Sequence, residues 1–367
     1  MPRAGRRVKQ KLASPPTTDA DAGTSTSDVA PWVPVAPTTT GLLALPVELF
    51  EMVLSDFEDI SVGSIMQNPT TLPKEEGERM RVLRALSQTC KALRASCLPR
   101  VWERLEACIE HNDSAWYKQV SSRLERRCNG LADNPDLAKF VKIATVTLTR
   151  CSTQTVLDAF TKCLAVLPNL HTLQIVHTHS QMTTTLKNHF EGKSFPQIRN
   201  IILPSCAHNI LRACPGVTSV TCNEDDGSKL VSAIRASCKG VVHVSGIRAE
   251  ESIMKRLAKA APNLREIHAN ACQVRVGYYR TLIVDPGDIK YLSVFKKLQR
   301  IVMIVGEEGD DEQIAGTCKL HVSAAQEALK ESSAKDKEVV IHYSKCDSPR
   351  NVNWRRWSTV RTVHIKV

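Results

Sequence analysis

Cysteine and histidine residues cluster in one part of the chain, where they could form a metal site. Cys206, His208 and Cys214 lie close together, and His177 and His179 precede them. Structural zinc sites usually supply paired ligands at close spacing on tight turns. These positions instead follow the pattern of repeated helices and strands. We therefore expect the cysteines to be small apolar core residues, and we expect no metal site.

Other catalytic patterns do not occur in the sequence. It has no Gly-rich phosphate loop, no Gly-x-Ser-x-Gly elbow and no His-Glu-x-x-His motif. A cysteine and histidine pair assembled by folding would leave no sequence signal, and nothing marks one of the 13 cysteines above the others. The sequence therefore predicts a protein that is not an enzyme and uses no cofactor.

Length and composition favour a reduced, intracellular protein with an aliphatic core. The 367 residues are 42% hydrophobic but only 5% aromatic. The cysteines form no Cys-x-x-Cys pair and follow no secretory signal, so we expect free thiols and a cytoplasmic or nuclear location. No apolar run approaches the length of a membrane span, so no membrane contact is expected. The formal net charge of +11 allows attraction to nucleic acid, anionic membrane or an acidic partner.

The first part of the chain has the composition of a disordered tail. Residues 1–40 are rich in Pro, Ser, Thr, Ala and Asp and cannot bury enough apolar surface to offset chain entropy. Arg3, Arg6, Arg7, Lys9 and Lys11 form a basic cluster at its start. This cluster is either a nuclear-import or nucleic-acid patch or a solvated basic tail.

Two amphipathic helices follow the tail. Pro46 suits the first turn of a helix over 45–54, in which Leu49, Met52 and Val53 share one face. In a second helix over 81–94, Leu83, Leu86, Cys90 and Leu93 repeat at helical spacing. Both helices are short, so each needs a partner surface, from the other or from a second protein.

Leu-Pro-x-Glu-Leu at 45–49, followed by Thr-Cys-Lys-x-Leu-Arg at 89–94, resembles an F-box. This small three-helix module docks to the Skp subunit of SCF-type ubiquitin ligases. The resemblance covers about 42–105 and is interrupted by an inserted surface loop over 56–80. It implies Skp binding through a set of positions on both helices: Leu45, Pro46, Glu48, Leu49, Met52, Leu83, Leu86, Cys90 and Leu93.

Helices are expected to continue after this motif. A helical pattern runs through Val101, Leu105 and Ile109, and a polar helix extends from about Trp116 to Arg127. Arg123, Arg126 and Arg127 in that helix are either a phosphate contact or a solvated face. We divide the chain into a tail (1–40), an F-box-like module (41–110), a helical linker (111–139) and a repeat region (140–367).

Short apolar strands alternate with helical segments from Phe140 onward. The nine predicted strands are 145–149, 172–176, 200–203, 218–222, 241–244, 265–269, 300–305, 339–343 and 361–365. Phrases such as Leu167-Pro-Asn-Leu170 and Ala261-Pro-Asn-Leu264 precede several of them. Taking Val146, Leu173, Ile201, Val220, Val242 and Ile267 as equivalent gives steps of 27, 28, 19, 22 and 25 residues.

These steps fall in or beside the period of leucine-rich repeats, and the phrase Pro-Asn-Leu-x-x-Leu resembles the degenerate repeats found behind an F-box, particularly in fungal proteins. The predicted fold class is therefore α/β, with a short helical module followed by an irregular solenoid. An ordinary α/β domain with a mostly parallel sheet is the alternative.

Three C-terminal segments carry separate expectations. Residues 307–312 form an acidic loop, either solvent-facing or a contact for a basic partner, and 324–337 forms a helix with lysines toward its end. Trp354-Arg-Arg-Trp357 either binds an anionic partner or caps the last repeat.

The resemblance implies a non-catalytic adaptor whose partners are Skp, a cullin ligase and an unknown protein target. The alternative is a repeat-based interaction scaffold without a ligase, which could contact nucleic acid through its excess of Lys and Arg. Nucleic acid is not expected as a partner of the adaptor.

Overall fold

The structure is a computed structural model. It describes residues 45–57, 60–62, 65, 77–108, 115–269, 273–276, 279–282, 286–306, 311–346 and 357–367. The predicted tail, most of the loop over 56–80, residues 307–310 of the acidic loop and Trp354 to Arg356 lie outside the described residues.

A ten-stranded sheet organises the described chain, and nine of its strands pair in parallel. In spatial order they are β1 (Arg104–Ala107), β2 (Ile143–Leu148), β3 (Thr172–Thr178), β4 (Asn200–Leu203), β5 (Ser219–Cys222), β6 (His243–Ser245), β7 (Glu266–His268), β10 (Arg300–Gly306), β11 (Glu338–Cys346) and the antiparallel β12 (Trp357–Lys366). The hairpin β8 (Gln273–Val276) and β9 (Tyr279–Leu282) is separate. The predicted α/β class is confirmed, and all nine predicted strands are present.

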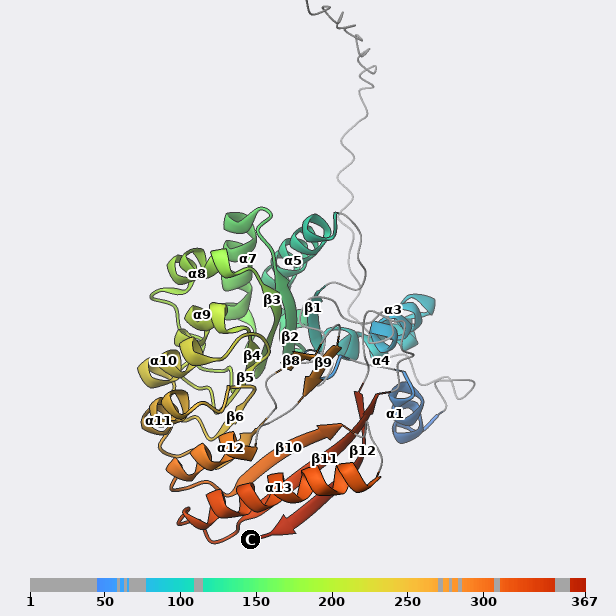
Figure 1. The fold of residues 1–367 in the computed structure, drawn as a ribbon. Helices are drawn as coiled ribbons and strands as arrows, with labels where there is room; N and C mark the ends of the chain where they lie inside the picture. Colours follow the sequence, from blue (N-terminus) through green and yellow to red (C-terminus); the bar gives the residue numbers. More distant parts are fainter. Residues whose placement is uncertain are drawn as a thin grey trace, which may run out of the picture.

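Helices cover one face of this sheet. They are α5 (Trp116–Ala132), α6 (Pro135–Ala138), α7 (Thr153–Val166), α8 (Thr183–Phe190), α9 (His208–Arg212), α10 (Ser228–Ser237), α11 (Glu251–Ala260), α12 (Pro286–Ile289) and α13 (Asp311–Lys330). Figure 1 shows the strands following one another along an arc, with helices α7 to α11 on its outer side. Short 3₁₀ turns complete several connections.

One row of apolar side chains runs through the sheet beneath the helices. The pairing register aligns Leu105, Ala144, Leu173, Ile201, Val220, Val244, Ile267, Ile301 and Val339, all of them in the core. The predicted equivalence of Val146 and Val242 is therefore wrong by two residues on each strand. An offset of two keeps a side chain on the same face, so Val146 is buried as expected, but Val242 precedes β6 and is only partly buried.

The recurring proline phrase forms a turn that closes each unit. In Leu167–Leu170, Phe195–Ile198, Cys214–Val217 and Ala261–Leu264, the last N–H donates to the first carbonyl oxygen at 3.1–3.4 Å. Both end residues of each phrase are buried. Each turn thus anchors the chain in the core just before a strand starts.

The N-terminal module contains three described helices: α1 (Val47–Ser55), α3 (Glu78–Thr89) and α4 (Lys91–Val101). The expected single helix over 81–94 is wrong, because Cys90 adopts an extended backbone (φ −152°) between α3 and α4. Its Sγ accepts a hydrogen bond from Leu93 N at 3.5 Å and caps α4. The helical pattern expected through Leu105 is also wrong, since Arg104–Ala107 is the first strand of the sheet.

Other helical predictions agree more closely. α5 contains the polar helix predicted from about Trp116 to Arg127, and α7, α10 and α11 lie between successive strands, where helical segments were expected. The C-terminal helix is longer than expected, beginning at Asp311, and it ends at Lys330, so Lys335 and Lys337 do not belong to it. Among the described residues, no helix has the length and apolar character that crossing a membrane requires.

Candidate functional site

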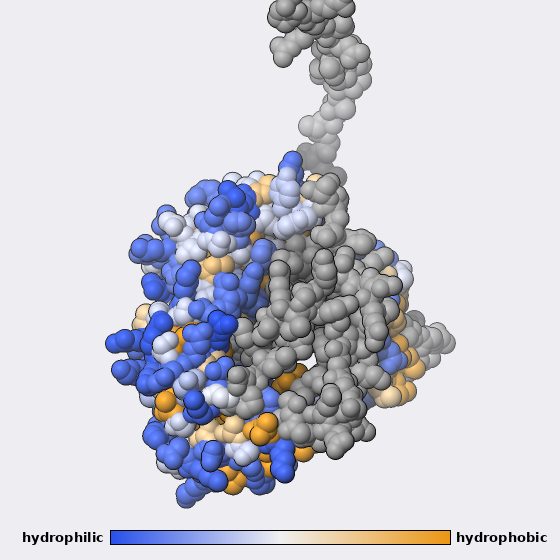
Figure 2. Space-filling view, in the orientation of Figure 1, coloured by the Kyte–Doolittle hydropathy of each residue, from blue (hydrophilic) through white to orange (hydrophobic). Residues whose placement is uncertain are grey.

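Helix α1 has two apolar faces, one buried and the other exposed. Phe50 and Leu54 are buried against Leu83 and Cys97 in a small core that is separate from that of the sheet. The face predicted from sequence points outward, because Leu49, Met52 and Val53 are 44%, 63% and 45% exposed. Figure 2 shows hydrophobic residues at the surface over this helix. The four-residue spacing of Phe50 and Leu54 is the sequence signal for the buried face, and it was not part of the predicted pattern.

Charged contacts hold α1 in place from behind. Arg100 of α4 donates from Nε to Glu51 Oε1 at 2.6 Å, and Arg79 of α3 contacts Glu51 Oε2 at 3.4 Å. The Arg100 guanidinium also lies 5.4 Å from the centre of the Phe50 ring. These contacts join all three helices, so the outward face of α1 is carried by a fixed support.

The other predicted Skp-binding positions are divided between surface and core. Leu45, Pro46, Glu48 and Cys90 are exposed, and Leu86 and Leu93 are partly buried. Leu83 lies in the core of the module. The structure therefore brings Leu45, Pro46, Glu48, Leu49 and Met52 together at one exposed helix, whereas Leu83 supports that helix from inside.

A buried carboxylate connects the module to the sheet. Glu106 on β1 is buried, and its Oε2 lies 3.5 Å from Arg84 Nη2 of α3. Arg127 on α5 donates from Nη1 to the Glu106 carbonyl oxygen. Burial, followed by the positive charge of Arg84, lowers the pKa of Arg127 to about 10, and Glu106 opposes that shift. Arg127 is therefore part of a structural contact and not a solvated face.

A second connection crosses the face of the sheet that the helices leave open. Arg104 on β1 donates to Thr145 Oγ1 (2.8 Å), Gln174 Oε1 (3.1 Å) and the Ile60 carbonyl oxygen (3.1 Å). Ile60 and Ile65 are buried there with Cys108, Val176 and Ile202. Parts of the predicted surface loop therefore pack against the sheet, so the expectation that this loop lies wholly at the surface is wrong.

The cysteines considered for zinc are engaged as thiol donors. Cys206 Sγ donates to the Thr178 carbonyl oxygen at 3.6 Å, and Cys214 Sγ to that of Ile210 at 3.3 Å. Burial raises the pKa of Cys206 to about 11 and also raises that of Cys214. Neither thiol is therefore poised to become the thiolate that binds metal. No cluster of three or more potential ligands occurs among the described residues.

Comparison of the sequence with protein-family models gives no match, and comparison with curated proteins gives none either.

Proposed function

We propose that this chain is a non-catalytic substrate-recognition adaptor of an SCF-type ubiquitin ligase. Helix α1 docks to the Skp subunit, and through it to the cullin, while the sheet region captures a protein target. The observation that carries the proposal is the exposed apolar face formed by Leu49, Met52 and Val53 on a helix that is fixed from behind. Such a face fits a partner that supplies a complementary apolar groove.

The residue types at the start of α1 and just before it support Skp as that partner. Leu45, Pro46, Glu48 and Leu49 are the positions at which the sequence resembles an F-box, and all four are exposed. An adaptor of this kind works in the cytoplasm or the nucleus, so we propose that localisation.

The order of the strands supports a leucine-rich-repeat-like solenoid as the target-binding part. Strands β1 to β7 lie side by side in chain order, and a helix or turn on the same face joins each pair. In a solenoid each unit contacts its neighbours in the chain and leaves one face free for binding.

The test is co-expression of the chain with Skp and cullin, followed by co-purification. Replacing Met52 with aspartate places a charge in the apolar contact, and we expect Skp binding to fall by at least about a hundredfold. Leu320→Asp on α13 is the matched control, because Leu320 is 64% exposed and Met52 is 63% exposed. The control variant should bind Skp like the wild-type chain.

A second pair addresses the neighbouring position and the helix start. Leu49→Asp should abolish binding, whereas Val166→Asp, at the same 44% exposure on α7, should not. Replacing Leu45 and Pro46 together by alanine should cost about 2 to 4 kcal/mol of binding free energy. If the wild-type chain fails to bind Skp, the adaptor proposal is wrong; if the folded α1 variants bind normally, another surface docks Skp.

A further inference from the structure

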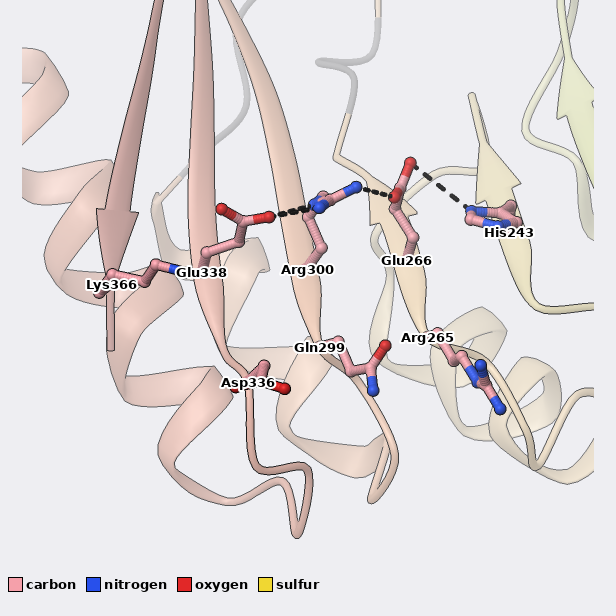
Figure 3. Close-up of a pocket in the computed structure, with 8 residues that line it drawn as sticks. All are labelled: His243, Arg265, Glu266, Gln299, Arg300, Asp336, Glu338 and Lys366. Atoms are coloured by element: carbon pink, nitrogen blue, oxygen red, sulfur yellow. Dashed lines mark hydrogen bonds and ion pairs between the residues drawn. The ribbon is translucent and has the colours of Figure 1, made fainter.

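A row of charged side chains crosses the last strands of the sheet, on the face that the helices do not cover. The pairing register aligns His243, Glu266, Arg300, Glu338 and Lys366 on β6, β7, β10, β11 and β12. Figure 3 shows the first four side by side, joined by dashed contacts. The residues that follow them on β6 to β11 belong to the core beneath the helices, so this row lies on the opposite face.

The central arginine of the row is held by two carboxylates. Arg300 Nη1 contacts Glu266 Oε2 at 2.9 Å, and Arg300 Nε donates to Glu338 Oε1 at 2.6 Å. A guanidinium carries five N–H donors, so this arrangement fixes the plane of the group and leaves donors for a ligand. Arg300 is thus oriented before any partner arrives.

The carboxylates lie beneath the cations. The side chains of Glu266 and Glu338 are 16% and 14% exposed, whereas that of Arg300 is 45% exposed. His243, whose Nδ1 lies 3.6 Å from Glu266 Oε1, and then His268, hydrogen-bonded to Glu266 at 2.8 Å, hold the pKa of Glu266 well below its usual value. His364 and then Arg300 lower the pKa of Glu338. Both carboxylates therefore stay ionised, each contacting Arg300 and a neighbouring histidine, and they are less exposed to solvent than Arg300.

The five residues of the row line a hollow of about 360 Å³, to which Arg265, Gln299 and Asp336 also contribute. Arg265 and Lys366 line it, both are exposed, and neither forms an ion pair with any residue that the structure describes. Asp336 is the one exposed carboxylate among the lining residues. The exposed charged groups of the hollow are thus the oriented Arg300, the unpaired Arg265 and Lys366, and one carboxylate, that of Asp336.

The other end of the open face is already occupied. Ile60 and Ile65 cover Cys108, Val176 and Ile202 next to strands β1 to β4. The charged row on β6 to β12 is at the opposite end of the strand order from these residues.

We propose that this hollow, with Arg300 at its centre and Arg265 and Lys366 at its margins, binds an acidic peptide segment of the target protein. Carboxylates of the segment pair with the outward N–H donors of Arg300 and with the two marginal cations. This inference rests on the proposed adaptor function, because it names the kind of target that the adaptor captures. Complementary charge chiefly sets specificity and the rate of association, so binding should be salt-dependent.

The test is to measure, by fluorescence anisotropy, the binding of a labelled peptide of alternating Glu and Asp to the 367-residue chain. Arg265→Glu combined with Lys366→Glu should weaken binding by at least about tenfold. Lys162→Glu combined with Lys187→Glu is the matched control. It changes the net charge equally, but through two exposed lysines on helices α7 and α8. The control should bind like the wild-type chain, which separates a local site from attraction to the overall positive charge.

Two further measurements complete the experiment. Arg300→Lys keeps the positive charge but loses the planar guanidinium that the two carboxylates orient, so it should weaken peptide binding several-fold. Equal weakening by both double variants, tighter binding of a single-stranded oligonucleotide than of the peptide, or no peptide binding would each overturn this inference. Skp co-purification of the same variants is measured in parallel. If a variant loses peptide binding but still binds Skp, its defect lies in the charged hollow. If the wild-type chain does not bind Skp, the adaptor proposal is wrong.

Discussion

Two residues two positions apart on α1 should separate folding of the module from docking. Leu54→Ala removes a buried side chain from the small core that it shares with Phe50, Leu83 and Cys97. Losses of this kind cost about 2 to 5 kcal/mol. Because this core is small and separate from that of the sheet, the cost should fall on local opening of α1, α3 and α4.

The assay is amide hydrogen exchange followed helix by helix. A loss of about 3 kcal/mol should speed exchange in α1, α3 and α4 by about a hundredfold, since about 1.4 kcal/mol corresponds to a factor of ten. Exchange in β2 to β6 should stay unchanged, because their core does not include Leu54.

Met52→Ala provides the contrast. Met52 is exposed, so its loss should change stability by less than about 0.5 kcal/mol. The same change removes apolar contact area and should weaken Skp binding by about tenfold. If Met52→Ala speeds exchange as much as Leu54→Ala, the assignment of one docking face and one core face is wrong.

Three other outcomes follow from the geometry of the sheet region. Among the ten cysteines whose exposure the structure describes, Cys90 and Cys151 should react first with a thiol reagent at neutral pH, and the buried eight only on unfolding; a fast buried thiol would contradict this. The pKa of Glu266 is depressed in the folded chain, so its charged contacts stabilise the fold above about pH 4 and are lost as the pH falls further; the destabilisation caused by Glu266→Gln in urea titrations should therefore shrink below about pH 4. A methyl group at Gly216 would overlap the Pro196 carbonyl oxygen, so Gly216→Ala should lower the free energy of unfolding by about 1 to 3 kcal/mol, and an unchanged urea midpoint would refute that close approach.

The repeat region was predictable because its local signals agree with its packing. Each proline phrase ends in a buried apolar residue and precedes a short apolar strand, such as β3, whose side chains are largely buried. Strand register was less accessible. Val242 and Val244 are two positions apart, and only the pairing of Val244 with Val220 of β5 shows which of them is in the buried row.

The errors near the module have local causes. Leu105 continues a helical spacing from Val101, yet it pairs with Ala144 of a strand far along the chain, so tertiary contact decided the outcome. Cys90 interrupts a helix without a glycine or proline to signal the break. The charged row on β6 to β12 was not found in the sequence, because its members come from five strands and only their pairing aligns them.

The side-by-side order of the strands also bears on how the chain folds. Between β2 and β7, each pairing closes a loop of one strand and one helix, so the entropic cost of each successive step is similar. The pairing of β7 with β10 is different, because the chain between them contains the hairpin β8–β9. Closing that loop therefore costs more conformational entropy than closing the loops between the preceding strands. We therefore expect β10 to β12 to join last during folding and to separate first in mild denaturant, which makes β7 the boundary between two cooperative units.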